Sequence, residues 1–403
     1  MSDQPAYTSY GPSDMDRFLL LFRHAFASTA AGTRHYVETV GPENFRVMRR
    51  NGSAVAGLGL LDMKQYFGGR AVRCRGISAV MVEPGERGRG TGGRMMAAML
   101  EETRAAGFPV STLYPATRPL YAKAGYGTAG DRITYRLPFG VLRGLRSDLG
   151  PELMAPVVRS TLEDMQAERA RRTNGLLARC ELLWQRALDS AAKPLDTWLI
   201  PGAGGPEGYL TLGPKSSDRT LHVEDWAALT PRAGRAILAF LAGWHSQAQA
   251  VTWAGGPEDV LIHLMPEVGA AIASWEQWML RITDVAGALT ARGWPMGVRA
   301  GLTLDVNDPL LAGNGGRYRL EVEDGAATVE RLSGHGSSPA SGAGSGQSAA
   351  GISLGVDALA TLYTGHLTPR TMADLGLLEA RPAALDTAAT LFAGPKPWLS
   401  DMF

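Results

Sequence analysis

A strand, a glycine-rich turn and a helix follow one another between residues 77 and 106, and no other stretch constrains the fold as strongly. Residues Ile77–Val82 are β-branched and apolar, which predicts a buried strand that a Pro-Gly pair ends. Residues 91–106 carry apolar side chains at helical spacing, and Gly107 stands where a C-terminal cap is expected. The turn therefore offers unpaired backbone N–H groups at a helix N-terminus, an arrangement that binds phosphates.

The turn is rich in glycine and arginine. It is not a Walker loop, because no Gly-Lys-Ser/Thr sequence follows it. It also lacks the setting of a dinucleotide fingerprint, which opens a βαβ unit and places an acidic residue about 20 positions later. A surface turn that is rich in glycine by chance is the bland alternative. The residues of the turn are Gly85, Glu86, Arg87, Gly88, Arg89, Gly90, Thr91, Gly92 and Gly93.

The pattern Arg87-x-x-Gly90-x-Gly92 after a Val-x-Val-x-Pro strand end resembles the pyrophosphate loop of the GNAT superfamily of N-acetyltransferases. Proteins of this superfamily bind acetyl-CoA. The resemblance implies that the loop and the strand before it hold this cosubstrate, and that Ala116 and Thr117 line its pantetheine arm. The implied contacts in the strand and loop are Val80, Met81, Val82, Arg87, Gly88, Arg89, Gly90, Thr91, Gly92 and Gly93.

A second motif, Leu-Tyr-x-x-x-Gly-Tyr at residues 120–126, follows the next predicted strand. It resembles the GNAT pattern in which a tyrosine beside the CoA sulfur is the general acid. When an amine attacks acetyl-CoA a thiolate leaves, and a positioned O–H can protonate it. The resemblance gives this role to Tyr121, whereas we expect Tyr126 to be a packing residue. An ordinary half-buried tyrosine is the structural alternative for Tyr121.

Composition and charge bound the class of protein. The 403 residues suggest two to three domains, and a hydrophobic fraction of 45% is ample for sizeable cores. A net charge of +1 gives no argument for nucleic acid or an anionic membrane surface, and two cysteines are too few for a disulfide framework. No signal peptide or membrane span is apparent. We therefore expect a soluble cytoplasmic protein without nucleic-acid or membrane partners.

Three domains are predicted, at residues 1–137, 138–283 and 284–403. The first begins with an amphipathic helix at 15–27 for which Ser13 is a plausible N-cap. The second repeats the order strand, turn, helix and strand. Its turn, Ala-Leu-Thr-Pro-Arg, has no glycine and one arginine. We interpret it as a degenerate GNAT-like unit that forms a wall of the substrate cleft or an interface.

The third domain has the order helix, sheet, helices, which is similar to sterol carrier protein domains. Residues 333–351 have almost no apolar bulk and predict a flexible loop, in which His335 is solvated rather than a ligand. The predicted fold class is therefore α/β (α+β), with two GNAT-like domains, the second degenerate, and a C-terminal sterol-carrier-protein-like domain.

The chain ends in phenylalanine, and its last residues include Trp398, Leu399 and Met402, which suit a docked tail. With the three domains this ending resembles the Eis (enhanced intracellular survival) family of acetyltransferases. The resemblance implies that the α-carboxylate of Phe403 enters the first domain's cleft as general base. A carboxylate whose pKa is raised by partial burial can accept the amine's proton. It also implies acetyl-CoA as cosubstrate, no metal, a homohexamer, and amines of aminoglycosides or similar polyamines as substrates.

The chain departs from that family in one respect. Members that use polycationic drugs have an acidic pocket, but residues 24–28 contain no acid here, and Asp401 lies one residue before the penultimate Met402. This argues against a preference for aminoglycosides and leaves acetyl transfer unaffected. Two alternatives stay open: a protein-lysine acetyltransferase, and a non-catalytic lipid- or ligand-binding protein that keeps the GNAT units as scaffold.

Overall fold

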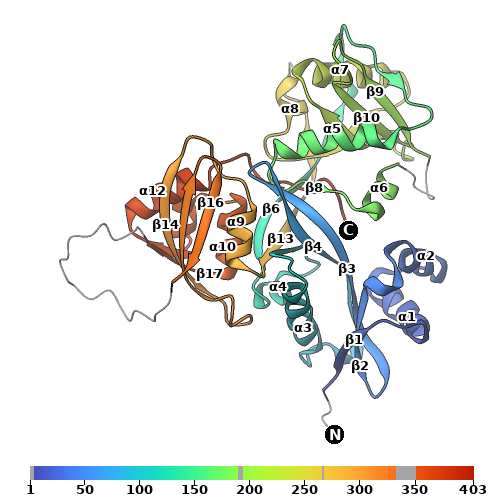
Figure 1. Ribbon diagram of the computed structural model, residues 1–403. Helices are drawn as coiled ribbons and strands as arrows, with labels where there is room; N and C mark the ends of the chain where they lie inside the picture. The colour runs from blue at the N-terminus through green and yellow to red at the C-terminus, as the bar shows by residue number, and fades with distance from the viewer. Residues whose placement is uncertain (1–3, 189–193, 266, 333–350) are drawn as a thin grey trace.

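The computed structural model describes residues 4–188, 194–265, 267–332 and 351–403, which form a long sheet, a short sheet and their covering helices (Figure 1). The long sheet runs in the order β1-β2-β3-β4-β5-β13-β6-β12-β11-β10-β9-β7, and β8 pairs with β3. Its strands are β1 (Ala6–Ser9), β2 (Phe45–Arg50), β3 (Ser53–Phe67), β4 (Arg70–Val82), β5 (Val110–Leu113), β6 (Gly127–Pro138), β7 (Glu152–Leu153), β8 (Leu177–Ala178), β9 (Asp196–Ile200), β10 (Gly208–Gly213), β11 (Thr220–Ala228), β12 (Ala250–Gly255) and β13 (Ala271–Ile282).

Helices cover this sheet in two groups. The first group is α1 (Met15–Phe26), α2 (Ala30–Val40), α3 (Thr91–Ala105) and α4 (Arg118–Lys123), and the second is α5 (Arg159–Arg171), α6 (Glu181–Leu188), α7 (Pro231–Ala242) and α8 (Val260–Leu264). The prediction of Ser13 as a cap is wrong: Asp14 is the residue before α1, and no side chain caps that helix. The carboxylate of Asp14 instead pairs with Arg49 at 2.6 Å. Among the described residues, no helix has the length and apolarity needed to cross a membrane.

The two halves of the sheet repeat one unit. In the first unit β4, α3 and β5 follow one another, and in the second unit β11, α7 and β12 do so, with parallel strand pairs in both. The units are joined by β13, which pairs with β5 on one side and with β6 on the other. The sequence did not indicate β13, because its first five residues are exposed and its partners are distant in the chain.

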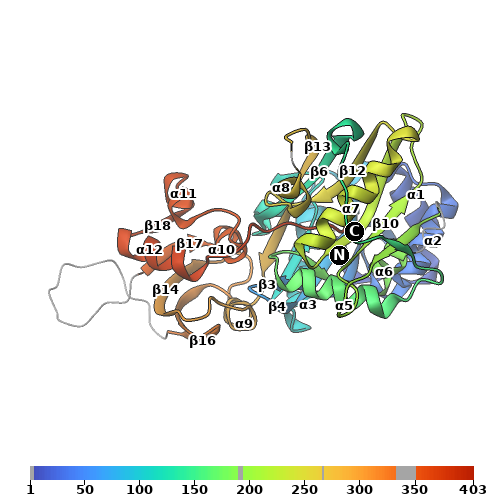
Figure 2. The ribbon, with the colours of Figure 1, turned by 90° about the horizontal axis from the view of Figure 1, so that it is seen from above.

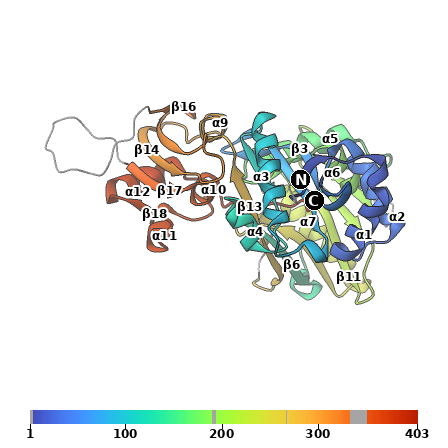
Figure 3. The same cartoon turned by 90° about the horizontal axis from the view of Figure 1, so that it is seen from below.

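The short sheet belongs to the third unit and stands to one side of the long sheet in all three views (Figures 1, 2 and 3). Its order is β16-β15-β14-β17-β18. The elements of this unit are α9 (Val285–Ala291), β14 (Arg299–Asn307), β15 (Gly316–Glu323), β16 (Ala326–Arg331), β17 (Gly351–Gly355), α10 (Val356–Thr364), α11 (Pro369–Asp374), β18 (Leu378–Ala380) and α12 (Pro382–Leu391). The predicted loop, with His335, lies at 333–350 outside the described residues, and Gly351 begins β17.

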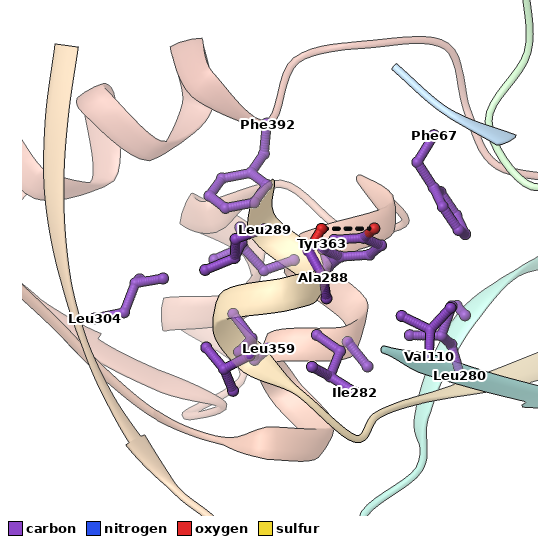
Figure 4. Packing of buried hydrophobic residues seen from close by; sticks show 14 of the residues in the cluster. Phe67, Val110, Leu280, Ile282, Ala288, Leu289, Leu304, Leu359, Tyr363 and Phe392 are labelled. Carbon is purple, nitrogen blue, oxygen red and sulfur yellow. Dashed lines mark hydrogen bonds between the residues drawn. The ribbon is translucent and has the colours of Figure 1, made fainter. Parts of the chain in front are cut away.

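A shared core fixes the third unit to the first (Figure 4). Phe67 and Leu280 of the long sheet and Leu359 and Tyr363 of α10 belong to one buried cluster. The Tyr363 hydroxyl donates to the Ala288 carbonyl at 3.2 Å, which satisfies its polar end within this core. Burial of this much apolar surface makes the third unit a fixed part of the molecule.

A substitution at Gly127 of β6 tests the contact between α10 and the long sheet. A Cβ atom there would lie 1.9 Å from the carbonyl oxygen of Asp357, so Gly127→Ala must move α10 away from the sheet. We expect a loss of about 1–3 kcal/mol in the free energy of unfolding, seen as a lower thermal midpoint. The matched control is Gly140→Ala, where a Cβ meets no atom within 4 Å. Equal midpoints for the two variants would contradict the packing described.

Candidate active site

The first unit has a gap in its sheet. Strand β4 pairs with β5 only from Cys74 to Gly76, opposite residues 110–112. In the described part of the chain, the edge of β4 that faces β5 has no strand partner from Ile77 onward, whereas its other edge pairs with β3 up to Val82. Three predicted cosubstrate contacts, Val80, Met81 and Val82, lie on this open edge. Its backbone N–H and C=O groups are available to an extended ligand.

A bulge marks the start of the open edge. The register of β3 with β4 shifts between Gly57 and Gly59, and Ala79 has a φ of 48°, in the left-handed region. This conformation costs a non-glycine residue roughly 1–2 kcal/mol. Bulges of this kind bend a strand and redirect its side chains, often beside active sites. The strain therefore accompanies the separation of β4 from β5.

The glycine-rich loop has the geometry of an anion site. A short 3-10 turn at Pro84–Glu86 leads to Gly88 and Gly90, whose φ angles of 76° and 78° favour glycine. Gly90 directly precedes α3 and offers no capping side chain, so N–H groups of the first helical turn stay available. Of the other predicted loop contacts, Arg87, Arg89 and Gly93 are exposed and Gly92 is half-buried.

Buried polar contacts that the sequence did not indicate hold this loop. Glu86 is buried, receives a hydrogen bond from the hydroxyl of Thr91 at 3.0 Å, and pairs with Arg50 at 3.0 Å. Burial alone would raise the pKa of Glu86, but these hydrogen bonds outweigh it and lower the pKa. Arg94 donates to the Arg89 carbonyl at 3.0 Å. Thr91 therefore offers only its backbone to a ligand, because its side chain points inward.

Tyr121 lies on α4 and is buried among methionines of α3 and Leu113 of β5. Burial raises its pKa to about 12, so the hydroxyl keeps its proton at neutral pH. Its ring meets that of Tyr126 edge-on at 6.1 Å between centroids, and the Tyr126 hydroxyl shares a hydrogen bond of 2.7 Å with Ser111. Tyr126 is thus a packing residue. Ala116 and Thr117 are both exposed, in the turn that leads from β5 to α4.

The C-terminal tail, residues 397–403, is docked onto β6 and onto Tyr114, the residue that follows β5. The backbone N–H of Asp131 donates to the Pro397 carbonyl, and the N–H of Leu399 donates back to the Asp131 carbonyl, both at 3.1 Å. The Tyr114 hydroxyl donates to the Leu399 carbonyl at 3.2 Å. These bonds fix the register of the tail, so the end of the chain is not frayed.

Phe403 is placed where β4 and β5 separate. Its ring packs edge-on against Tyr114, with 5.9 Å between centroids. A Cβ atom at Gly76 would lie 3.0 Å from the ring, so glycine at the last paired position of β4 makes room for it. Leu113 packs in the cluster of Tyr121, and adjacent strand residues point to opposite faces. Tyr121 and Phe403 therefore approach the gap from opposite faces of the sheet.

A cavity of about 390 Å³ lies between α2 and α6, near the chain end. Its residues Tyr36 and Leu182 belong to the apolar cluster against which Phe403 packs, and Arg186 donates to the Met402 carbonyl at 3.3 Å. No carboxylate lines this cavity in the described part of the chain. Its full lining is Gly32, His35, Tyr36, Thr39, Leu182, Gln185 and Arg186.

Comparisons with known families define the class of protein that this fold and site represent. A profile described as an acetyltransferase (GNAT) domain matches residues 6–129, a second acetyltransferase (GNAT) domain profile matches residues 175–282, and a sterol carrier protein domain profile matches residues 285–400. The predicted fold class is confirmed. The predicted boundaries at 137 and 283 stay predictions, and β6 and β13 cross between the two GNAT units.

Relatives that align with most of the chain show the family. The chain is 32% identical over 364 residues to an uncharacterized N-acetyltransferase of Streptomyces griseus, with 83% of each chain covered. An uncharacterized N-acetyltransferase of Streptomyces avermitilis is 30% identical over 367 residues, with 83% of this chain and 82% of the relative covered. The chain therefore belongs to the GNAT N-acetyltransferases, which use acetyl-CoA. It is an acyltransferase, and the non-catalytic alternative is set aside.

Two solved structures superpose on almost the whole chain. A GCN5-related N-acetyltransferase from Anabaena variabilis has a TM-score of 0.91 and 33% identity, covering 99% of this chain and 100% of its own. Eis1 from Mycobacterium abscessus has a TM-score of 0.79 at 23% identity, covering 99% of this chain and 100% of its own, and shares the fold. Membership of the Eis family itself stays a prediction.

The loop geometry predicts the effect of a single methyl group. Gly88→Ala has free space around its Cβ but must hold a left-handed φ, which costs roughly 1–2 kcal/mol. We expect KM for acetyl-CoA to rise by about 5- to 30-fold if that cost falls on the bound loop. The control is Gly85→Ala, which has the same free space and no left-handed φ. Equal KM values in steady-state assays of the two variants would contradict this account.

Proposed function

We propose that the protein transfers the acetyl group of acetyl-CoA to a primary amine in the gap of the first GNAT unit. Tyr121 acts as general acid and the α-carboxylate of Phe403 as general base. The observation that carries this proposal is the docked chain end, which meets the separation of β4 and β5 from the face opposite Tyr121.

The cosubstrate would occupy the loop and the open strand edge. The N–H groups at the start of α3, with Arg87 and Arg89 nearby, suit a pyrophosphate, because the charges are complementary and the glycines allow close approach. The edge at Val80–Val82 would pair with the amide groups of pantetheine, and Ala116 and Thr117 would line the opposite wall. In the described residues no three His, Cys, Asp or Glu side chains gather as a metal site requires.

The reaction needs two proton transfers. The amine nitrogen attacks the thioester carbonyl, so that a C–N bond forms and the C–S bond breaks. The Phe403 carboxylate takes a proton from the amine, and Tyr121 gives its proton to the departing thiolate. The buried phenol with its raised pKa suits an acid that stays protonated until the thiolate forms.

The acceptor amine belongs to one of two classes, polycationic amines or amines of low positive charge. Aminoglycosides and similar polyamines are the class that the Eis resemblance implies. The cavity beside the chain end has no lining carboxylate among the described residues, however, and Asp401 is paired with Arg179 at 2.7 Å. These two observations favour an amine of low positive charge, such as a lysine side chain, over a polycation. A homohexamer and a cytoplasmic location are further proposals that rest on the same resemblance.

Replacing the acid tests the first catalytic role. We expect Tyr121→Phe to lower kcat by about 10²–10⁴-fold and to leave KM for acetyl-CoA near its native value. Since the pKa of Tyr121 is raised to about 12, the native rate should not fall through loss of this proton as pH rises through 10. Tyr126→Phe, which removes only the bond to Ser111, is the control. An equal kcat loss in the two variants would remove Tyr121 from the mechanism.

Changing the chain end tests the base. One glycine added after Phe403 moves the carboxylate by up to about 3.5 Å, and we expect kcat to fall at least about 100-fold. Phe403→Leu keeps the carboxylate at the chain end and should retain most of the activity. Thiol release from acetyl-CoA measures both. A native rate in the extended protein would rule out the terminal base.

The charge of the cavity predicts the order of substrates. A lysine-containing peptide should have a higher kcat/KM than an aminoglycoside, because no carboxylate among the described lining residues offsets several positive charges. Gln185→Glu adds one carboxylate to this lining and should lower KM for the aminoglycoside more than for the peptide. Preference of the native protein for the aminoglycoside would return the polyamine class to first place.

A further inference from the structure

One buried arginine links the tail to the second GNAT unit. Arg179 follows β8 directly, and its side chain is 3% exposed. Its Nε donates to Asp401 of the tail at 2.7 Å. Its Nη1 and Nη2 donate to the two carboxylate oxygens of Asp225 on β11, at 2.5 and 2.9 Å. We call Arg179, Asp225 and Asp401 the Arg179 clamp.

The geometry of the clamp fixes the orientation of its three side chains. A buried ion pair gains little over a well-packed apolar contact, because desolvation offsets the attraction. A two-point arginine–carboxylate contact does fix orientation, which a lysine cannot reproduce. The Tyr209 hydroxyl also donates to Asp225 at 2.7 Å, which immobilises the carboxylate that orients Arg179.

The clamp acts close to the reacting end of the chain. Asp401 stands two residues before Phe403, and two residues of extended chain span about 7 Å. The Met402 carbonyl between them accepts from Arg186 of α6. Errors of about 1 Å in the placement of a catalytic group can cost about 100-fold in rate. The position of Asp401 therefore limits where the Phe403 carboxylate can lie.

The tail passes the second unit beside the strand ends that correspond to the gap of the first unit. Strands β11 and β12 pair from Thr220 to Val223, opposite residues 250–253, which is a short parallel stretch like that between β4 and β5. Beyond that point, Trp226 donates to the Ala254 carbonyl at 3.3 Å and spans the gap. The Trp398 ring of the tail lies 4.8 Å from the Arg169 guanidinium, which also stacks on Trp226 at 3.7 Å.

We propose that Arg179 is the positioning residue for the terminal base, and that the second GNAT unit contributes to catalysis by holding Arg179 through Asp225. This inference rests on the proposed function of Phe403. It gives the degenerate unit a defined role, because Trp226 fills its strand gap and its Asp225 holds the arginine that contacts the tail. Asp401, which would be a substrate-binding acid if it were free, is part of the clamp.

The central experiment uses Asp401→Ala, which breaks the clamp from the side of the tail and leaves Arg179 paired with Asp225. We expect kcat to fall about 10- to 100-fold with KM for acetyl-CoA unchanged, because the donor site is untouched. Added formate should restore part of the rate, since a small carboxylate can replace a displaced base. Asp401→Asn keeps one acceptor for Arg179 and should lose less.

Arg179→Lys and a matched control complete the test. Arg179→Lys keeps the charge but cannot hold both carboxylates, so it should behave like Asp401→Ala. The control is Asp308→Asn, which weakens the fully buried Arg281–Asp308 pair away from the tail. Asp308→Asn should lower the thermal midpoint, and formate should not raise its kcat.

The outcomes separate the inference from the proposed function. Two results would overturn the role of the clamp: a native kcat in Asp401→Ala, or a loss of kcat that matches the loss of folded protein and is not reversed by formate. If the glycine-extended chain is inactive in the same assays, the terminal base of the proposed function still stands. If the glycine-extended chain keeps its native rate, the terminal base falls and the clamp falls with it. A kcat loss with formate rescue in Asp401→Ala and Arg179→Lys, and not in Asp308→Asn, supports the inference.

Discussion

The pairing of β13 with β6 is the interaction on which the rest of the structure depends. Strand β13 pairs with β6 from Ala271 to Leu280 and with β5 from Met279 to Ile282, so the two GNAT units share one continuous sheet. Asp131 of β6 accepts hydrogen bonds from Trp275 and Gln277 of β13, at 2.7 and 3.1 Å, and its backbone pairs with the tail. The strand pair that joins the two units therefore also binds the C-terminal tail.

In the proposed mechanism, this arrangement divides the work of one reaction among three units. The first unit has the open strand edge and the loop, where we propose that acetyl-CoA binds. The second has the same strand gap without a glycine-rich loop, and its gap is filled by Trp226 while its Asp225 holds Arg179. The third unit packs on the first through a common core and sends the tail back across β6. A terminus normally frays, and here contacts from the first two units prevent this.

Local patterns in the sequence were enough to predict the parts of the site that are contiguous. The strand, loop and helix from Ile77 onward depend on neighbours in the chain, as does the order strand, turn, helix and strand in the second unit. The fold class and the enzyme class, which the comparisons confirm, were predicted from such contiguous patterns and from the order of the three units. Ser13 failed as a cap because a 3-10 turn at Pro12–Asp14 precedes α1, so that Ser13 lies inside a turn and Asp14 takes the position before the helix.

The parts of the structure that the sequence did not predict depend on pairings between distant residues. Strand β13 begins exposed, and its buried half contains Arg281, whose partner Asp308 comes from the third unit. The Arg179 clamp joins residues that are 46 and 222 positions apart. Periodicity cannot reveal such partners, because it reports which face of an element is buried and not what covers it.

The most direct test of the account is a crystal structure of the protein with bound CoA. The account predicts the pyrophosphate over the N-terminus of α3, pantetheine along Val80–Val82, and the sulfur within hydrogen-bond reach of the Tyr121 hydroxyl, with the Phe403 carboxylate on the other side of the gap. CoA bound in the second unit, or a sulfur remote from both groups, would contradict it.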